Sequence, residues 1–459
     1  MISNKTIPGI CARGFQRMGM DTADGKPFVR ASGRGRMEVR SVADLSPGER
    51  SALFERDAGV DAVRDDVREI VERVQTEGDV ALREFSSEFD DVDVGNIDIT
   101  DQAERAREQI DSELLTAIET AAENIEAFHE RQRPTDWRED FEGRELGRRY
   151  WPLDSAGVYA PGGTAAYPSS ALMGVIPAKV AGVEHVAVAT PPAEEINPAT
   201  LAAIDVAGAD VVYQVGGAQA IAALAYGTET VGAVDVVVGP GNRWVTAAKA
   251  EVRGDVQIDF LAGPSELLVV ADETADPELV AADLLAQAEH DTDASVVAVT
   301  DDEALAAAVV DAMEQQITSR ERADVIEGAL ASDASGVLHA RSMSEATLFA
   351  DEYAPEHLSI QADDDEALLD RIDNVGSAFL GSHSPVAAGD YASGPNHVLP
   401  TSGRARLVGG LSVDTFVRST TIQRLSEESL GALRETITTL ATAEGLEGHA
   451  ASVEKRFEE

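Results

Sequence analysis

Amphipathic helical patterns fill the first part of the chain body. Between about residues 46 and 133, apolar side chains recur every three or four positions among many charged ones. One clear stripe consists of Val63, Val67, Ile70 and Val74. We expect these helices to bury one face on a larger body and to leave the charged face in water.

The pattern changes near Gly157, where short Val-rich runs begin to alternate with Ala-rich stretches of helical length. Examples of the runs are HVAVAT, VVYQV, VDVVV and SVVAV, and a typical following stretch is AQAIAALAYG. Continuous apolar strands separated by helices are typical of parallel sheets that are covered on both faces. About ten such strands precede Phe379, which is too many for one small sheet, so we expect two α/β domains. From Arg418 to Glu459 we expect a mainly helical segment.

The composition is strongly acidic, with 83 Asp and Glu against 37 Lys and Arg and a formal net charge of -46. A phosphate backbone or an anionic membrane face would repel such a surface, which argues against nucleic-acid and peripheral membrane binding. No apolar run approaches the ~18 residues of a spanning helix. We expect a cytoplasmic protein from an organism with molar internal salt, because salt screens the mutual repulsion of the carboxylates. A merely acidic mesophilic protein is the alternative.

Residues 1–36 differ from the body. They carry seven Lys and Arg against two Asp, and they hold Cys11, the only cysteine. They follow neither a helical nor a strand period and lack the apolar core of a signal peptide. We expect a disordered tail or a mispredicted upstream start, with Met37 as the alternative first residue. The body then has no thiol, which excludes disulfides and thiolate metal sites there.

The familiar nucleotide-binding fingerprints are incomplete. GPGNRW at residues 239–244 lacks the third glycine of GxGxxG, and neither GxxxxGK[ST] nor GxSxG occurs. The glycine turns GVYAPGG and GPGN nevertheless follow predicted strands, where open α/β sheets bind ligands and helix N-termini favour a pyrophosphate. Such glycines also occur in plain turns, so both interpretations stay open.

Two polar pairs are candidates for chemistry. Gln287 and His290 are three positions apart at the end of an Ala/Leu-rich helix, so an amide oxygen and an imidazole project from one face toward a zinc-like ion. A solvated helix end is the alternative. Glu356 and His357 are adjacent before the strand-like LSIQ and suit a general acid/base pair, although an exposed turn would look the same.

Two further histidines lie in unusual loops. Asp390 and His397 lie in GDYASGPNHVLP, a Gly- and Pro-bounded segment that suits a rigid ligand-binding loop or an ordinary long loop. Glu444 and His449 lie in EGLEGH, where two glycines end the last helix.

Together these residues resemble the histidinol dehydrogenase family, the NAD-dependent enzymes of the last two steps of histidine biosynthesis. The matching stretches run in the family's order, from about Met37 to His449: GVYAPGGTAAYPSS, VGGAQAIAALAYGTETV, VDVVVGPGN, AGPSELLV, QAEHD, YAPEHL, GSAFLGSHSP, AGDYASGPNHVLPT and AEGLEGH. QAEHD alone would be a weak signal, whereas nine ordered blocks are specific. The departures are residues 1–36 and the acidic surface, and neither touches a functional position.

The resemblance implies a zinc ion in each subunit that anchors the substrate. Its ligands would be Gln287, His290, Asp390 and His449, although an N/O site of this kind also accommodates Mn²⁺ or Co²⁺. The positions that match substrate contacts are Ser265, Gln287, His290, His357, Asp390, His397, Glu444 and His449.

The resemblance also implies the catalytic roles. His357 would take the hydroxyl proton while hydride leaves for NAD⁺, and Glu356 would then activate water on the aldehyde. The positions that match dinucleotide contacts are Tyr159, Gln219 and Asn242, which would give the glycine turns a purpose.

The fold that the resemblance implies is α/β, with two Rossmann-like parallel-sheet domains, a helical N-terminal segment and a C-terminal helical dimer arm. We place the first Rossmann-like domain, with the N-terminal helices, at residues 37–158 and 265–410, the second at 159–264, and the arm at 411–459. In the family the arm is exchanged between subunits. Glu444 and His449 would then complete the site of the other monomer and make the homodimer obligatory for activity.

The expected function is therefore oxidation of L-histidinol through L-histidinaldehyde to L-histidine with two NAD⁺. The first alternative is a zinc and NAD dehydrogenase of the same fold that acts on another amino or sulfonated alcohol; retention of Glu356, His397, Glu444 and His449 argues for histidinol. A zinc hydrolase with Glu356 as general base is disfavoured, because it would not need paired α/β domains and glycine turns. A non-catalytic metal-binding protein is disfavoured by the intact Glu356–His357 pair.

The acidic composition predicts that folding depends on salt. Circular dichroism across a KCl titration should show structure lost in dilute buffer and restored in molar salt, where the Debye length shrinks to roughly 3 Å. Full native structure in dilute buffer would contradict the halophilic interpretation.

Overall fold

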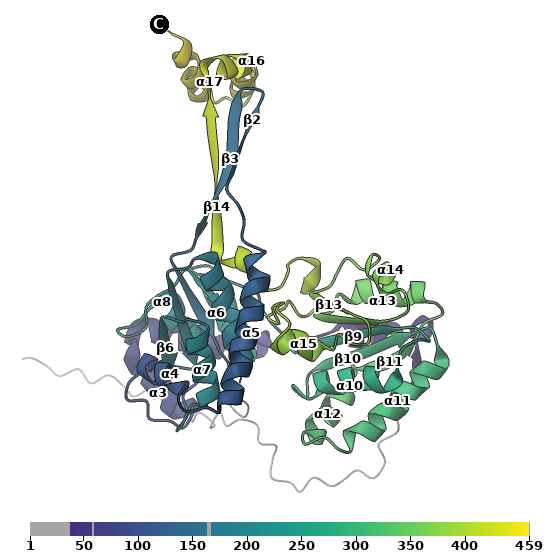
Figure 1. Ribbon diagram of the computed structural model, residues 1–459. Coiled ribbons are helices and arrows are strands. Elements are labelled where there is room, and N and C mark those ends of the chain that lie inside the picture. The colour runs from purple at the N-terminus through teal and green to yellow at the C-terminus, as the bar shows by residue number, and fades with distance from the viewer. Residues whose placement is uncertain (1–36, 57–58, 163–166, 459) are drawn as a thin grey trace, which may run out of the picture.

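Two lobes stand side by side and a long, narrow stalk rises from one of them (Figure 1). The structure is a computed structural model that describes residues 37–56, 59–162 and 167–458. The prediction for residues 1–36 lies outside the described residues.

The first lobe contains a parallel five-stranded sheet in the order β6-β5-β4-β7-β8. Its strands are β4 (Ser155–Tyr159), β5 (His185–Thr190), β6 (Val211–Gln214), β7 (Val236–Val238) and β8 (Gln257–Ile258). The connecting helices are α6 (Pro168–Ala181), α7 (Pro198–Val206), α8 (Gly217–Tyr226) and α9 (Arg243–Val252). Counted along the chain, the order is 3-2-1-4-5, so the winding direction reverses between β4 and β7, as in Rossmann folds.

The N-terminal helices cover this same lobe. They are α2 (Val60–Glu77), α3 (Asp79–Phe89), α4 (Thr100–Ala106) and α5 (Ser112–Glu130). The stripe from Val63 to Val74 is buried in one core with α8 and α9, and Ile125 of α5 is buried in another core with α6. This packing differs from the predicted grouping of residues 37–158 with 265–410. A helical period shows that a face is buried, but it does not show which sheet that face covers.

The second lobe contains a parallel six-stranded sheet in the order β1-β11-β10-β9-β12-β13. Its strands are β1 (Arg40–Ser41), β9 (Glu266–Ala271), β10 (Ser295–Thr300), β11 (Gly336–His339), β12 (His357–Gln361) and β13 (Ser377–Leu380). Its helices are α1 (Pro47–Phe54), α10 (Pro277–Ala288), α11 (Glu303–Ile317), α12 (Ala323–Leu330), α13 (Met343–Tyr353) and α14 (Asp365–Leu369). Apart from the edge strand β1, the order is again 3-2-1-4-5. The prediction of an α/β fold with two parallel sheets is confirmed.

The stalk is an antiparallel sheet in the order β14-β3-β2, capped by two helices at its tip (Figure 1). Its elements are β2 (Trp137–Phe141), β3 (Arg144–Pro152), β14 (Val417–Leu425), α16 (Glu427–Ala443) and α17 (Glu447–Glu454). The expectation of a mainly helical segment from Arg418 is confirmed by α16 and α17, but it missed β14. None of the β14 side chains is buried in this chain, so the strand carries no apolar alternation that would have revealed it.

Among the described residues, no helix combines the length and the apolar character that crossing a bilayer requires.

Candidate functional site

The predicted catalytic pair lies at the amino edge of the six-stranded sheet. Helix α13 ends at Tyr353, Ala354 adopts a left-handed conformation with φ of 51°, and Pro355 cannot continue the helix. The chain therefore turns sharply into β12, and Glu356 and His357 are both buried at the start of that strand.

The hydrogen bonding of His357 determines which ring nitrogen is able to accept a proton. Nδ1 lies 2.9 Å from the carbonyl oxygen of Glu266. A carbonyl only accepts, so Nδ1 carries the hydrogen and Nε2 carries the free lone pair. Nε2 is buried without a hydrogen-bond partner and lies 3.7 Å from Oδ1 of Asp390. Burial, with smaller effects from His397 and His290, lowers the pKa of His357 to about 4, so the imidazole is neutral and available as a base.

Glu356 is held beside it. Its Oε2 accepts a hydrogen bond of 2.8 Å from the backbone N–H of Glu266 and lies 3.5 Å from Nδ1 of His357. Burial, followed by the charge of Glu266, raises the pKa of Glu356 well above its usual value. A carboxyl group with a raised pKa is a stronger proton acceptor once ionised, which suits a general base.

A partly buried loop joins the two lobes beside this pair. Helix α15 (Val386–Tyr391) carries Asp390, whose pKa burial raises to about 7. Nδ1 of His397 lies 2.8 Å from the carbonyl oxygen of Asp390, and Nε2 lies 3.3 Å from Oγ of Ser170, at the start of α6 in the other lobe. The Asn396 amide donates to the Met173 carbonyl of α6 at 2.7 Å. The loop is thus bonded to both lobes.

Three of the predicted zinc ligands lie at this edge, since α10 ends shortly before β10 begins and Oδ1 of Asp390 lies 3.7 Å from Nε2 of His357. Gln287 is buried in the last turn of α10, and His290 follows it with an exposed side chain. A positive charge on His290 would lower the pKa of His357 and of His397. An amide oxygen, a neutral imidazole and the Asp390 carboxylate form a donor set that fits zinc.

The remaining ligand is elsewhere in the chain. Glu444 ends α16 and His449 lies in α17, and both residues are exposed. These two helices cap the tip of the stalk, away from both lobes (Figure 1). Within the described ranges, no three His, Cys, Asp or Glu side chains are grouped closely enough to hold a metal ion. The donor set is therefore incomplete in a single copy of the chain.

The predicted dinucleotide contacts lie at the carboxyl edge of the five-stranded sheet, where its winding reverses. Tyr159 ends β4, and its hydroxyl accepts a hydrogen bond of 3.1 Å from Gly217 N–H at the start of α8. Gln219 is buried in the first turn of that helix, and Asn242 caps α9 by accepting from Trp244 N–H at 3.0 Å. Two helix N-termini thus lie at this edge, a position that favours an anionic group such as a pyrophosphate.

The glycine turn in GPGN has a steric cause. Gly239 has φ of 112°, and a Cβ added there would lie 2.3 Å from the Tyr159 carbonyl oxygen. Only glycine permits the close approach of the ends of β7 and β4. This accounts for the turn without a complete GxGxxG motif.

Ser265 immediately precedes β9, next to the catalytic pair, and its carbonyl accepts from Ser295 N–H at 2.9 Å.

Sequence reasoning missed three charged residues near these sites. Asp90 follows α3; its buried Oδ2 has no hydrogen-bond partner, burial raises its pKa to about 6, and its charge contributes to the raised pKa of Tyr159. Arg56 and Glu266 form a buried ion pair behind Glu356. The available signal for Glu266 was a charge that opens a wholly apolar strand; Asp90 and Arg56 lie in ordinary charged contexts.

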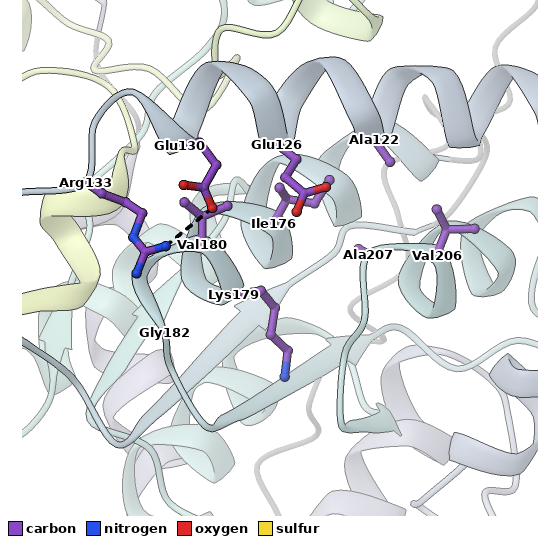
Figure 2. A pocket seen from close by; sticks show the side chains of 10 residues that line it. All are labelled: Ala122, Glu126, Glu130, Arg133, Ile176, Lys179, Val180, Gly182, Val206 and Ala207. Atoms are coloured by element: carbon purple, nitrogen blue, oxygen red, sulfur yellow. Dashed lines mark ion pairs between the residues drawn. The ribbon is translucent and has the colours of Figure 1, made fainter.

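A hollow of about 310 Å³ lies between α5, α6 and α7, lined in part by Glu126, Glu130 and Lys179 (Figure 2). Glu130 pairs with Arg133 at 3.5 Å, the contact drawn in the figure. None of the predicted site residues lines this hollow, and we assign it no chemistry.

Known proteins match the whole described body. The family model for histidinol dehydrogenase matches residues 54–457. The histidinol dehydrogenase of Haloarcula marismortui is 78% identical over 422 residues, 92% of this chain and 100% of that protein. That of Halobacterium salinarum is 73% identical over 424 residues, with the same shares covered. The crystal structure of histidinol dehydrogenase from Elizabethkingia anophelis matches with a TM-score of 0.87 and 37% identity over 92% of this chain and 99% of that one.

The loop between the lobes yields a stability prediction. Asn396→Ala would leave the buried Met173 carbonyl and the Val398 N–H without their partner, at a cost of about 1–3 kcal/mol in the free energy of unfolding. Hydrogen exchange across residues 390–400 should accelerate as well.

The matched control is Asn124→Ala, because Asn124 donates to the carbonyl of Ala392 in the same loop but is exposed. It should change the free energy of unfolding by no more than about 0.5 kcal/mol. Equal costs for the two variants, measured by chemical unfolding in molar KCl, would show that the buried bonds do not hold the loop.

Proposed function

Because the chain belongs to the histidinol dehydrogenase family, we propose that it oxidises L-histidinol through L-histidinaldehyde to L-histidine with two NAD⁺. The observation that best supports this activity is the free, buried Nε2 of neutral His357 beside Glu356. An alcohol oxidation requires a base at the hydroxyl, and the aldehyde step requires a base for water. The pair offers both in adjacent residues.

The first oxidation depends on His357. The substrate hydroxyl gives its proton to Nε2 as the carbon loses hydride and the C=O bond forms. The hydrogen bond from Nδ1 to the Glu266 carbonyl at 2.9 Å keeps Nε2 unprotonated beforehand and favours the imidazolium afterwards. When bound, NAD⁺ supplies the hydride acceptor, and we place it on the edge formed by Tyr159, Gln219 and Asn242.

The second oxidation depends on Glu356. Its carboxylate removes a proton from water as the water oxygen adds to the aldehyde carbon, while protonated His357 returns the proton it took in the first step to the aldehyde oxygen. The neutral His357 then takes a hydroxyl proton of the hydrate as the second hydride departs to a second NAD⁺. The buried setting excludes bulk water and retains the aldehyde between the two steps.

We propose that Gln287, His290 and Asp390 hold one zinc ion per subunit together with His449 of a second copy. When bound, the ion supplies a fixed positive charge that orients the imidazole and amine of the substrate. Ser265 and His397, with Glu444 of the second copy, would contact the substrate around it.

A homodimer with shared sites follows from the position of the arm. The stalk and tip expose large apolar side chains, which is the usual mark of an association surface: Trp137, Phe141, Trp151, Leu440 and Leu446. Three exposed strands without a core of their own also need a partner for stability. A two-fold dimer lets each arm reach the other body.

We also propose a cytoplasmic location and adaptation to molar salt. The net charge of -46 supports this, as do the close relatives from the halophilic archaea Haloarcula marismortui and Halobacterium salinarum.

The test of the activity is NADH formation from L-histidinol by the purified protein in molar KCl, counted per histidinol consumed. We expect two NADH per substrate, with activity lost on chelation and restored by zinc, because the bound ion anchors the substrate.

If one NADH forms per histidinol consumed and free aldehyde accumulates, only the proposed role of Glu356 is contradicted. The absence of NADH from a folded, dimeric protein would favour a dehydrogenase of another alcohol.

A further inference from the structure

Glu266 is a wholly buried acidic residue that the proposed reaction does not use. It opens β9 with 0% exposure. Its main chain touches both catalytic groups, because its N–H donates to Glu356 at 2.8 Å and its carbonyl accepts from His357 at 2.9 Å. One residue thus orients the base of each oxidation step.

The Glu266 side chain is surrounded by donors from three separate segments. Nη1 of Arg56 lies 2.5 Å from Oε2, and the backbone N–H of Glu356 donates to the same oxygen at 3.3 Å. The backbone N–H of Ser402 donates to Oε1 at 2.5 Å. Burial raises the pKa of Glu266 and Arg56 opposes that rise; since every partner is a donor, we assign the ionised form.

Arg56 is fixed as firmly as its partner. Nη2 donates to the Tyr353 carbonyl at 2.8 Å, and the guanidinium lies 3.9 Å from the centre of the Tyr353 ring. Tyr353 is the last residue of α13, directly before the turn that delivers Glu356. The ion pair therefore holds that turn from both ends.

Stability alone does not explain this pair. Removing two charges from water costs about as much as their attraction returns, and apolar residues of similar volume often serve equally well. A buried pair that grips the backbone of a catalytic carboxylate has a second use, because misplacing a reacting group slows a reaction far more than it weakens binding.

We propose that Glu266 and Arg56 are positioning residues for the second oxidation: they fix the turn that aims the Glu356 carboxylate and set the charge balance around it. The proposal rests on the proposed function, and neither residue is expected to touch substrate. Its consequence is a selective effect on the aldehyde step, because the Glu266 side chain bonds the Glu356 backbone, whereas the His357 ring is held by the Glu266 main chain, which side-chain substitutions leave in place.

The charges around Glu356 predict opposite pH effects for the two partners. The groups that face it are Glu266 and Asp390, which raise its pKa, Arg56, which lowers it, and the neutral His357. Glu266→Gln should therefore move the acid limb of aldehyde oxidation to lower pH. Arg56→Met should move it to higher pH, and the double variant should leave it near the wild-type position.

The experiment measures kcat and KM over pH for L-histidinol and for L-histidinaldehyde separately, with the dimeric holoenzyme in molar KCl. Glu266→Gln should lower kcat of the aldehyde step about tenfold or more while KM changes little and alcohol oxidation is much less affected. The matched control is Asp205→Asn, which replaces the carboxylate of the remote Arg107–Asp205 pair by an amide and should change neither step nor limb.

The double variant Arg56→Met/Glu266→Gln buries no unpaired charge and serves if a single variant does not fold. It should still lose kcat on the aldehyde, because the bond to the Glu356 backbone is weakened. The proposal would be overturned by a wild-type kcat for the aldehyde in the double variant, or by equal losses of kcat on the alcohol and aldehyde steps. It would also be overturned if the acid limbs of Glu266→Gln and Arg56→Met moved in the same direction. Wild-type protein that forms no NADH from either compound would overturn the proposed function, and this proposal with it.

Discussion

The contact between the amino edge of one parallel sheet and the carboxyl edge of the other determines where chemistry is possible in this chain. The loop from Asp390 to Ser402 makes that contact through His397 on Ser170, Asn396 on Met173 and Thr401 on Gly263. Apart from the edge strand β1, both sheets have the same strand order, yet they use opposite edges. The five-stranded sheet presents glycine turns and helix N-termini, and the six-stranded sheet presents the ends of α10 and α13 with the side chains that start β9 and β12. We propose that the dinucleotide and the bases meet across this contact.

Burial at this contact sets the protonation of the site. Away from bulk water, the imidazoles of His357 and His397 stay neutral and the Glu356 carboxyl gains basicity. The same burial would be costly for Glu266 without Arg56 and its backbone donors. The reacting groups are thus ready to remove protons. The charged groups of Glu266 and Arg56 lie behind Glu356 and do not react themselves.

The stalk separates Glu444 and His449 from the contact between the two parallel sheets. β14 pairs with β3 from Val417 to Leu425, and the two helices beyond it carry Glu444 and His449 at the far tip. The three proposed zinc donors on the body and the one on the arm cannot meet within one chain in this conformation. The exposed apolar side chains of the arm are typical of a surface that binds another protein chain. Both features have one explanation if two copies exchange arms.

Much of this architecture was predictable from local patterns. Continuous apolar runs of residues predicted the strands of the two sheets. The adjacent Glu356 and His357 predicted a pair of proton-transferring side chains. Both kinds of feature can be recognised from a few neighbouring residues. The stalk strands had no such signature, since their side chains face water in this chain. The lobe covered by Val63 and its stripe was equally hidden, because one apolar helix face fits either sheet. Glu266 was missed because its partner Arg56 lies 210 positions away, and only the fold joins them.

Subunit complementation tests the shared site most directly. A Glu356→Gln variant has a body that cannot oxidise the aldehyde and a His449→Ala variant has a defective arm, so neither homodimer should show activity, measured as formation of L-histidine. After subunit exchange, verified with different affinity tags, half of the dimers are mixed and one of their two sites has both an intact body and an intact arm. Activity should then return to about a quarter of the wild-type level. Mixed dimers without activity would contradict a site that is completed by the arm of the second copy.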